Sequence, residues 1–240
     1  MEKKLIIEKL KSENELKTKW LSLIAHDFKG MFHNIVYLLN AYEKKDIPQE
    51  MFLTMLPEIK QIAEKNLKTL DSTFAWINAQ TDGFKLQIED VSIYELFLEL
   101  KEELHSQISS KDISIRYSGD ETLVLQSDKL LLKFILKQVL ENAVKYSNKD
   151  AEVMFIAGSQ HNETCIEIKD QGMGMSNNVH NNIFTLDGSP YKGTQNEVGA
   201  GLSLVIVKDF IEKLGGSVEV HSKPNEGTIV KISLDTKHRA

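Results

Sequence analysis

The sequence lacks several features that define common protein classes. A single cysteine, Cys165, among 240 residues excludes an internal disulfide framework and any multi-cysteine metal site. No run of about 18 apolar residues occurs, so no segment is predicted to span a membrane. Acidic residues outnumber basic ones by 35 to 29, which argues against non-specific binding to nucleic acids or anionic membranes. Neither GxxxxGK[ST] nor GxGxxG occurs, so the P-loop and the dinucleotide-binding fingerprint are also excluded.

The first 80 residues contain two stripes of apolar residues at helical spacing. The first stripe is Leu21, Ile24, Phe28, Met31, Ile35, Leu38 and Tyr42; the second is Leu56, Ile59, Ala63, Leu67, Leu70, Phe74 and Ile77. Pro48 separates them, and Pro57 is predicted either to kink the second helix or to lie in its first turn. The stripes predict a helical hairpin. Since two helices cannot bury both stripes, we expect a homodimeric four-helix bundle.

After Thr81-Asp82-Gly83 the pattern becomes mixed. Strands are expected at 85–90, 113–117, 122–126, 151–159 and 163–170, and two more near the C-terminus. A helix is expected at 93–108, opened by the capping-box pair Ser92 and Glu95. Two more helices are expected, one from a cap at Ser127 or Asp128 to about Val144 and one at 202–214. Residues 171–200 show no periodicity, and a loop of that length is usually functional. The predicted fold class is α+β, with a helical hairpin followed by an α/β sandwich.

His26 is the first residue whose position suggests chemistry. The heptad pattern places it at the most exposed position of the first helix, seven residues before His33. The adjacent Asp27 could accept a hydrogen bond from one ring nitrogen and leave the other nucleophilic. The alternative is an ordinary solvated histidine.

Three further polar motifs lie in the second part. Gln138, Asn142 and Lys145 share one helix face, which could hold a metal-bound triphosphate or could simply be solvated. Asp170, Gly172 and Gly174 follow a strand, where the glycines let backbone approach a flat ligand. Gly199, Gly201 and Leu202 open a helix, whose free N–H groups favour phosphate. Taken alone, each glycine motif is equally consistent with a turn or an ordinary helix entry.

In combination and in this order, the segments SLIAHDFKG, LENAVKYS, DQGMGMS and GAGLSLVIVKDFIEKLGG resemble the motifs of sensor histidine kinases of two-component systems. The resemblance covers residues from about 15 to 236. It implies a helical lead-in (1–15), a dimerisation and phosphotransfer hairpin (16–80), a linker (81–84), an ATP-binding domain shared with gyrase and the heat-shock chaperone (85–236) and a tail (237–240). It also implies ATP and Mg²⁺ as cofactors, a response regulator receiver domain as partner, and a cytoplasmic location, alone or within a membrane-anchored sensor.

The resemblance assigns roles to individual residues. His26 corresponds to the phosphoacceptor and Asp27 to the acid beside it; Asn142, with Gln138, corresponds to the metal-binding amides; Asp170 corresponds to the residue that reads adenine. The remaining nucleotide-binding positions are Lys145, Tyr146, Gly172, Gly174, Phe184, Gly199, Gly201, Leu202 and Thr228.

Departures from the family pattern bear on which reaction is expected. Gln138 stands where related ATPases carry a water-activating glutamate, which disfavours hydrolysis. Gly30 and Met31 replace the Thr or Asn and the Pro that usually follow the histidine, so we expect weak or absent phosphatase activity toward the regulator. The alternatives to a kinase are an ATPase of the same fold and a degenerate kinase that acts as a dimeric docking module.

Overall fold

The structure is a computed structural model that describes residues 32, 33, 35–57, 59, 60, 63, 64, 67, 85–160, 162–185, 194 and 203–236. The chain divides into two compact units, Met1–Phe84 and Lys85–Ala240. Within the described part, no helix is both long and apolar enough to cross a membrane.

The described residues of the first unit form two helices joined by a turn, as predicted for the tip of the helical hairpin. Seven residues of the two predicted stripes lie outside the described residues: Leu21, Ile24, Phe28, Met31, Leu70, Phe74 and Ile77. Residues 35–43 form one helix, and the second helix begins at Gln49, directly after Pro48. The Phe52 N–H donates to the Pro48 carbonyl (3.1 Å), and the rings of Tyr42 and Phe52 stack with centroids 4.4 Å apart. Because the second helix begins at Gln49, Pro57 lies beyond its first turn.

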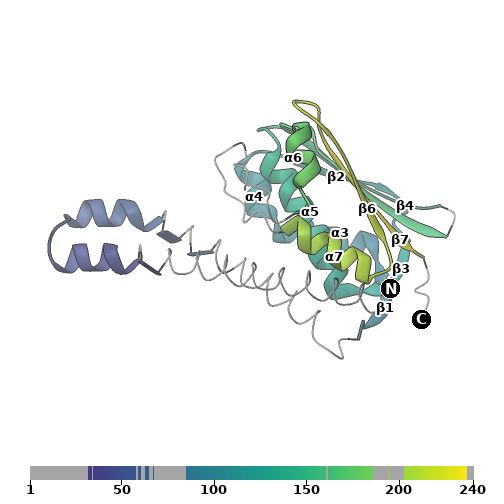
Figure 1. Cartoon of the computed structure of the whole chain (residues 1–240), viewed down its shortest axis with the longest axis horizontal. Coiled ribbons are helices and arrows are strands. Elements are labelled where there is room, and N and C mark those ends of the chain that lie inside the picture. The colour runs from purple at the N-terminus through teal and green to yellow at the C-terminus, as the bar shows by residue number, and fades with distance from the viewer. Residues whose placement is uncertain are drawn as a thin grey trace, which may run out of the picture. The chain divides into compact units, whose positions relative to one another are not determined.

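The second unit contains two sheets and five helices among its described residues (Figure 1). The strands are β1 (Ile88–Ser92), β2 (Ser114–Gly119), β3 (Val124–Asp128), β4 (Glu152–Gln160), β5 (Glu163–Lys169), β6 (Ser217–Lys223) and β7 (Gly227–Asp235). The helices are α3 (Ile93–Glu103), α4 (His105–Ser110), α5 (Lys129–Tyr146), α6 (Asn177–Asn182) and α7 (Ser203–Lys213).

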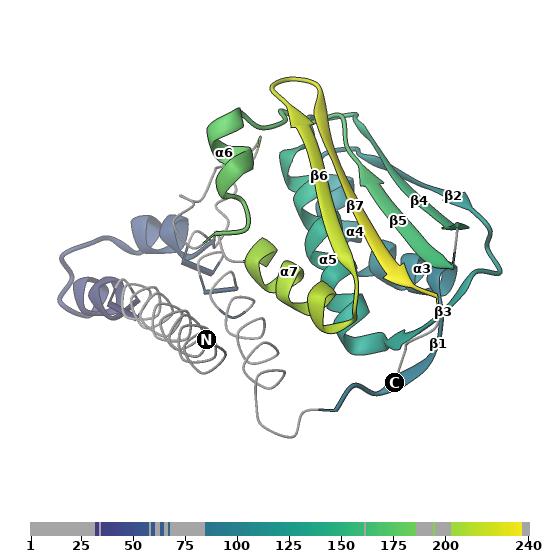
Figure 2. The same ribbon diagram turned by 45° about the vertical axis from the view of Figure 1, so that its right-hand side comes forward.

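The main sheet has the strand order β2-β4-β5-β7-β6, and a separate two-stranded sheet pairs β1 with β3. Only β2 and β4 run parallel; the other strand pairs are antiparallel. Helices α3, α5 and α7 cover one face of the main sheet (Figures 1 and 2). Burial alternates along β4, where Val153, Phe155 and Ala157 are buried against these helices. This is the α+β sandwich that the periodicity predicts.

The central helix α5 is fixed at its start by Asp128. Its Oδ1 accepts from the N–H groups of Leu130 and Leu131 (both 3.1 Å), and its Oδ2 accepts from Gln87 N–H (2.9 Å). Of the two candidate caps, Ser127 and Asp128, the structure therefore selects Asp128. The helix ends at Tyr146, two residues beyond the predicted end at Val144. Ser92 caps α3 as predicted, since its Oγ accepts from Glu95 N–H (3.3 Å).

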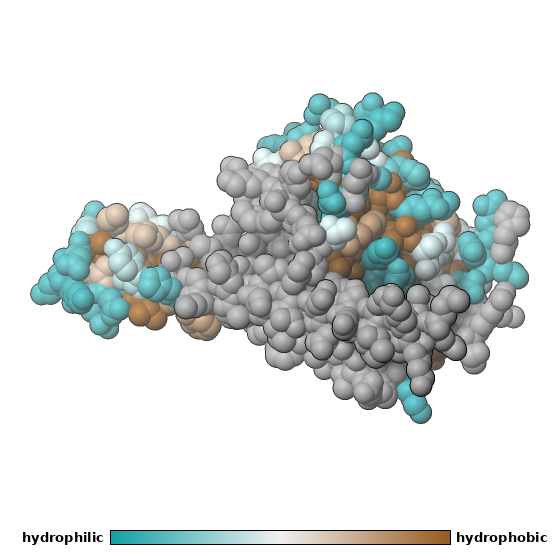
Figure 3. All heavy atoms as spheres, in the orientation of Figure 1, coloured by the Kyte–Doolittle hydropathy of each residue, from teal (hydrophilic) through white to brown (hydrophobic). Residues whose placement is uncertain are grey.

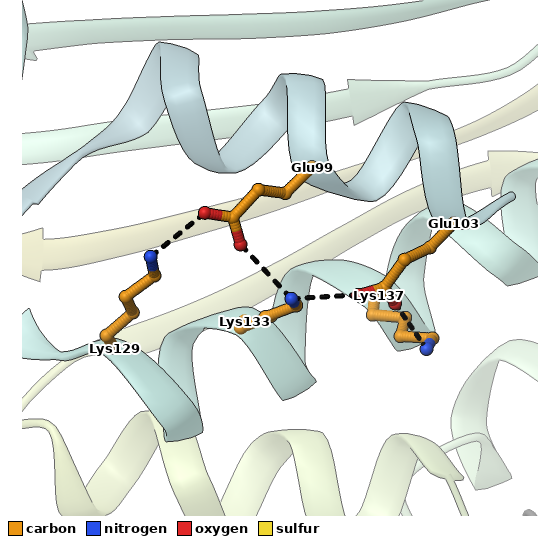
Figure 4. Close-up of polar contacts among 5 residues, drawn as sticks. All are labelled: Glu99, Glu103, Lys129, Lys133 and Lys137. Atoms are coloured by element: carbon orange, nitrogen blue, oxygen red, sulfur yellow. Dashed lines mark hydrogen bonds and ion pairs between the residues drawn. The ribbon is translucent and has the colours of Figure 1, made fainter.

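Five charged side chains join α3 to α5 along their length (Figure 4). Glu99 bridges Lys129 and Lys133 (2.9 and 3.1 Å), and Glu103 bridges Lys133 and Lys137 (2.8 and 2.5 Å). We call this set the α3–α5 ladder. Hydrogen bonds from Lys129 and Lys133 lower the pKa of Glu99, and those from Lys133 and Lys137 lower the pKa of Glu103.

Two predicted segments differ in the structure. The helix expected at 93–108 is broken at Leu104 into α3 and α4. Leu100 before the break, Leu104 at the break and Ile108 after it are all buried. Their spacing of four residues is the same as in one continuous helix, so the sequence pattern does not reveal the break. The segment 171–200 contains α6, whose sequence NNVHNN has poor helix propensity. Its His180 Nε2 lies 2.8 Å from the Val220 carbonyl of β6, a tertiary contact that no local pattern reveals.

Candidate functional site

The buried carboxylate of Asp170 is the centre of the candidate site. It follows β5 and is 6% exposed. Its Oδ1 accepts from the N–H groups of Gly172 (2.8 Å) and Thr228 (3.1 Å), and its own N–H donates to the Thr228 carbonyl (2.9 Å). Burial raises the pKa of Asp170 to about 6, although the two N–H donors oppose that rise. Oδ2 has no hydrogen-bond partner among the described residues, so it is free to accept from a ligand.

The two glycines after Asp170 are required by close backbone contacts. A Cβ on Gly172 would lie 2.2 Å from the carbonyl oxygen of Tyr146, and one on Gly174 would lie 1.9 Å from that of Lys223. Gly174 also has φ +60°, a conformation that favours glycine. The Met173 N–H donates to the Tyr146 carbonyl (3.1 Å). The glycine turn is thus packed directly on the C-terminal end of α5.

Helix α5 brings the predicted amide and cation to this turn. Gln138, Asn142, Lys145 and Tyr146 are all half-buried on it. Lys145 Nζ lies 3.0 Å from the Tyr146 hydroxyl and 4.6 Å from the centroid of its ring. One helix end therefore presents an aromatic ring and a positive charge beside the glycine turn, a combination suited to a base and phosphates.

Two further predicted residues lie on neighbouring elements. Thr228 on β7 holds Asp170 through its backbone, and its hydroxyl lies 2.9 Å from Ser222 Oγ. Phe184 follows α6, and Lys208 Nζ of α7 lies 5.8 Å from its ring centroid. The remaining predicted residues, His26, Asp27, Gly199, Gly201 and Leu202, lie outside the described residues.

Two residues that contact the end of α5, Lys111 and Thr194, are not among those predicted from the sequence. Lys111 is only 2% exposed, and its Nζ donates to the carbonyls of Val144 and Lys145 and to the hydroxyl of Thr194. A lysine followed by aspartate between a helix and a strand is typical of a solvated turn, so no sequence signal identifies it.

The site has the properties that ATP requires. Asp170 Oδ2 can accept a hydrogen bond from an exocyclic amine, and Gly172 allows a flat base close to the backbone. Lys145 carries a positive charge of the kind that pairs with phosphate, and Asn142 carries an amide oxygen of the kind that binds Mg²⁺.

Comparison with known proteins agrees with this geometry. Residues 127–238 match the histidine kinase-, DNA gyrase B- and HSP90-like ATPase family. The sensor histidine kinase YvrG of Bacillus subtilis is 25% identical over 231 residues, 94% of this chain and 39% of that protein. The sensor histidine kinase YcbM of the same organism is also 25% identical, over 93% of this chain and 73% of that protein. The chain thus spans well under half the length of some of these relatives.

Solved structures show the same fold. Histidine kinase AdeS of Acinetobacter baumannii superposes with a TM-score of 0.68 at 13% identity, covering 88% of this chain and 98% of that one. Histidine kinase ThkA, solved in complex with the response regulator protein TrrA, gives 0.68 at 16% identity over 96% of this chain and 64% of that one. ShkA, solved with AMPPNP, gives 0.63 at 21% identity over 77% of this chain and 39% of that one. Residues 127–238 therefore carry a domain of the histidine kinase-, DNA gyrase B- and HSP90-like ATPase type, and over most of its length the chain is similar to sensor histidine kinases.

Proposed function

We propose that the chain is an ATP-dependent protein-histidine kinase that phosphorylates His26 and passes the phosphoryl group to an aspartate of a response regulator. The observation that carries this proposal is the buried Asp170 carboxylate, held by Gly172 and Thr228 against the end of α5. In this proposal residues 16–80 form the phosphotransfer hairpin and residues 85–236 bind ATP. The likeness to named sensor histidine kinases over 94% of the chain supports both assignments.

In this proposal, nucleotide binding combines residues that the structure describes with the second glycine motif, which lies outside the described residues. Asp170 accepts the hydrogen bond of the adenine amine, and Phe184, Gly172 and Tyr146 surround the base. Lys145 neutralises phosphate charge, together with the N–H groups at Gly199, Gly201 and Leu202. Asn142, with Gln138 one turn before it on α5, would hold Mg²⁺, which would add to the neutralisation of charge on the phosphate oxygens.

The transfer step belongs to His26 and Asp27. The unprotonated ring nitrogen of His26 attacks the γ-phosphorus, so a P–N bond forms while the bond to the ADP oxygen breaks. Asp27 accepts a hydrogen bond from the other ring nitrogen, which fixes the tautomer and stabilises the imidazolium that develops. The phosphoryl group then moves to the regulator's aspartate and regenerates neutral His26.

The proposal includes a homodimer formed through the hairpin and a receiver domain as partner. The structure of ThkA with TrrA is of a histidine kinase with a response regulator, which supports that partner class. We place the reaction in the cytoplasm, by analogy with sensor kinases.

Incubation with labelled ATP and Mg²⁺ tests the proposal. We expect an acid-labile, alkali-stable label on wild type and none on His26→Ala, which should still bind nucleotide. His33→Ala is the matched control, since His33 lies at the equivalent position of the predicted heptad but is followed by Asn34 instead of an acid. Label that survives in His26→Ala would refute the phosphoacceptor assignment. Phosphate release without labelling would instead indicate an ATPase, and nucleotide binding without either would indicate a docking module.

We also propose that phosphatase activity is weak, because Gly30 has no side chain to orient the water that attacks a phospho-aspartate. Mixing the protein with its phosphorylated regulator and ADP should leave the regulator's decay rate unchanged. Gly30→Thr or Gly30→Asn should accelerate decay while autophosphorylation persists. Rapid decay with the wild-type protein would contradict this.

A further inference from the structure

Lys111 is a buried cation outside the set of residues that contact nucleotide in the proposed function. It lies between α4 and β2, and its Nζ is 3.2 Å from the Val144 carbonyl, 2.6 Å from the Lys145 carbonyl and 3.5 Å from the Ser147 carbonyl. The Thr194 hydroxyl lies 2.8 Å from the same nitrogen. An ammonium carries three donors and is costly to bury without acceptors, so these oxygens account for its position.

The acceptors of Lys111 are the carbonyls at the end of α5. The last carbonyls of a helix lack partners within the helix, and its C-terminus favours positive charge. The same end carries Lys145 and Tyr146, and the Tyr146 carbonyl accepts from Met173 of the glycine turn. Lys111 therefore fixes the helix end on which the proposed site is built.

Thr194 connects this helix end to the chain between the two glycine motifs. Its hydroxyl donates to the Ser147 carbonyl (2.6 Å), its N–H donates to the Lys145 carbonyl (3.3 Å), and its oxygen accepts from Lys111. Lys111, Thr194 and the last residues of α5 thus share one hydrogen-bond network, in which removal of one member alters the others.

We propose that Lys111 is a positioning residue for nucleotide binding, acting through Thr194 and the end of α5 without touching the nucleotide. This rests on the proposed binding of ATP. Loss of the Lys111 ammonium removes the donor to the Val144 and Lys145 carbonyls and to the Thr194 hydroxyl. Of the two side chains, Thr194 alone then holds this helix end, and Lys145 and Tyr146 are less firmly placed toward the ligand. The effect falls on nucleotide affinity and depends on the Thr194 hydroxyl.

The test is a double-mutant cycle on the full chain, with the dissociation constant of Mg²⁺–AMPPNP as readout and thermal unfolding measured in parallel. We expect Lys111→Met and Thr194→Val each to weaken binding, Lys111→Met by about tenfold. The double variant should bind no more weakly than Lys111→Met alone, because both changes break one network. Lys149→Met is the matched control, since Lys149 follows α5 but forms an exposed ion pair with Asp112 (3.1 Å); it should bind as wild type does.

The outcomes separate the two proposals. If wild type does not bind AMPPNP, the proposed function fails and this inference fails with it. If wild type binds AMPPNP, two results overturn the proposed role of Lys111 and leave the proposed function intact. One is a Lys111→Met variant with a lowered unfolding temperature but unchanged affinity; the other is additive losses of affinity in the double variant. Should Lys111→Met not fold, Thr194→Val decides the question, and wild-type affinity in that variant overturns the proposal.

Discussion

At the scale of the residue, Asp170 has conflicting requirements. Burial favours its protonated form, whereas the N–H groups of Gly172 and Thr228 and the proposed adenine amine all favour the carboxylate. A pKa of about 6 places its titration just below neutral pH. Asp170 therefore reduces folding stability as a carboxylate, while the nucleotide binding that we propose requires that carboxylate.

We expect the affinity for Mg²⁺–AMPPNP to fall as the pH is lowered through 6, about tenfold for each pH unit below the pKa, because only the carboxylate accepts from the amine. Asp170→Asn should bind weakly at every pH, since its amide presents a donor to a donor. Calorimetric titration between pH 5 and 8 measures both proteins. Titration of the AMPPNP phosphates affects wild type and Asp170→Asn equally, so the difference between the two curves of affinity against pH reports the titration of Asp170. Parallel curves would contradict the assignment.

The contribution of Asp170 to folding stability should rise as the pH is lowered, whereas nucleotide affinity should fall. The folded-state pKa of Asp170 lies above its ordinary value of 3.8, so the folded state holds the proton more tightly. The contribution of this group to stability is full below about pH 4 and is lost as the pH rises through 6. Asp170→Asn should consequently keep or exceed the wild-type unfolding temperature at pH 7.5, which separates its binding defect from unfolding.

At the scale of the element, the α3–α5 ladder should stabilise the packing of α5. Its side chains are partly exposed, so replacing Glu99 and Glu103 together by Gln should cost about 1 kcal/mol in the free energy of unfolding. Because both glutamates have lowered pKa values, this contribution is complete above their ordinary value of 4.5 and is lost as the pH falls through the folded-state pKa.

Urea unfolding at pH 7 and pH 3, at low and high salt, measures the ladder. The difference in the free energy of unfolding between wild type and the double variant should be smaller at pH 3 than at pH 7, and smaller in high salt than in low salt. Glu102→Gln, also exposed on α3 but outside the ladder, is the matched control. A gap that is equal in all four conditions would show that packing, not charge, explains the loss.

The same elements show what a sequence can and cannot predict. The cap at Ser92 and the strand preceding Asp170 were predictable because both depend on neighbouring residues. The break at Leu104 was not, because apolar spacing is unchanged across it. Nor was the bond between Asp170 and Thr228, which are 58 residues apart, or the burial of Lys111. Contacts between distant segments depend on the tertiary fold, and periodicity carries no record of them.

At the scale of the whole molecule, the hairpin leaves apolar surface without a cover in the single chain. Leu38, part of the predicted stripe, is already buried at 4% exposure. Val36 and Leu39, three residues apart on the same helix, are 54% and 46% exposed. Leu53 on the second helix is 52% exposed, and Figure 3 shows hydrophobic and hydrophilic residues side by side on the hairpin. The apolar row that is exposed on the described part of the first helix is therefore Val36 and Leu39, which are not members of the stripe that the sequence suggested.

We predict that the chain is a homodimer through this row, because a second hairpin would remove several large apolar side chains from water at roughly 1.5–3 kcal/mol for each one fully buried. The double variant Val36→Glu, Leu39→Glu should sediment as a monomer at micromolar concentration. In a dimer, the two new carboxylates of each protomer would be buried in an apolar interface without a partner of opposite charge. Tyr37→Glu adds the same charge to an exposed position that lies about 100° from Val36 and about 160° from Leu39 around the same helix, and should leave the dimer intact. Nucleotide affinity should be unchanged in both variants, because the site is built entirely from the second unit. A wild-type monomer, or a dimer that survives both glutamates, would exclude this row as the interface.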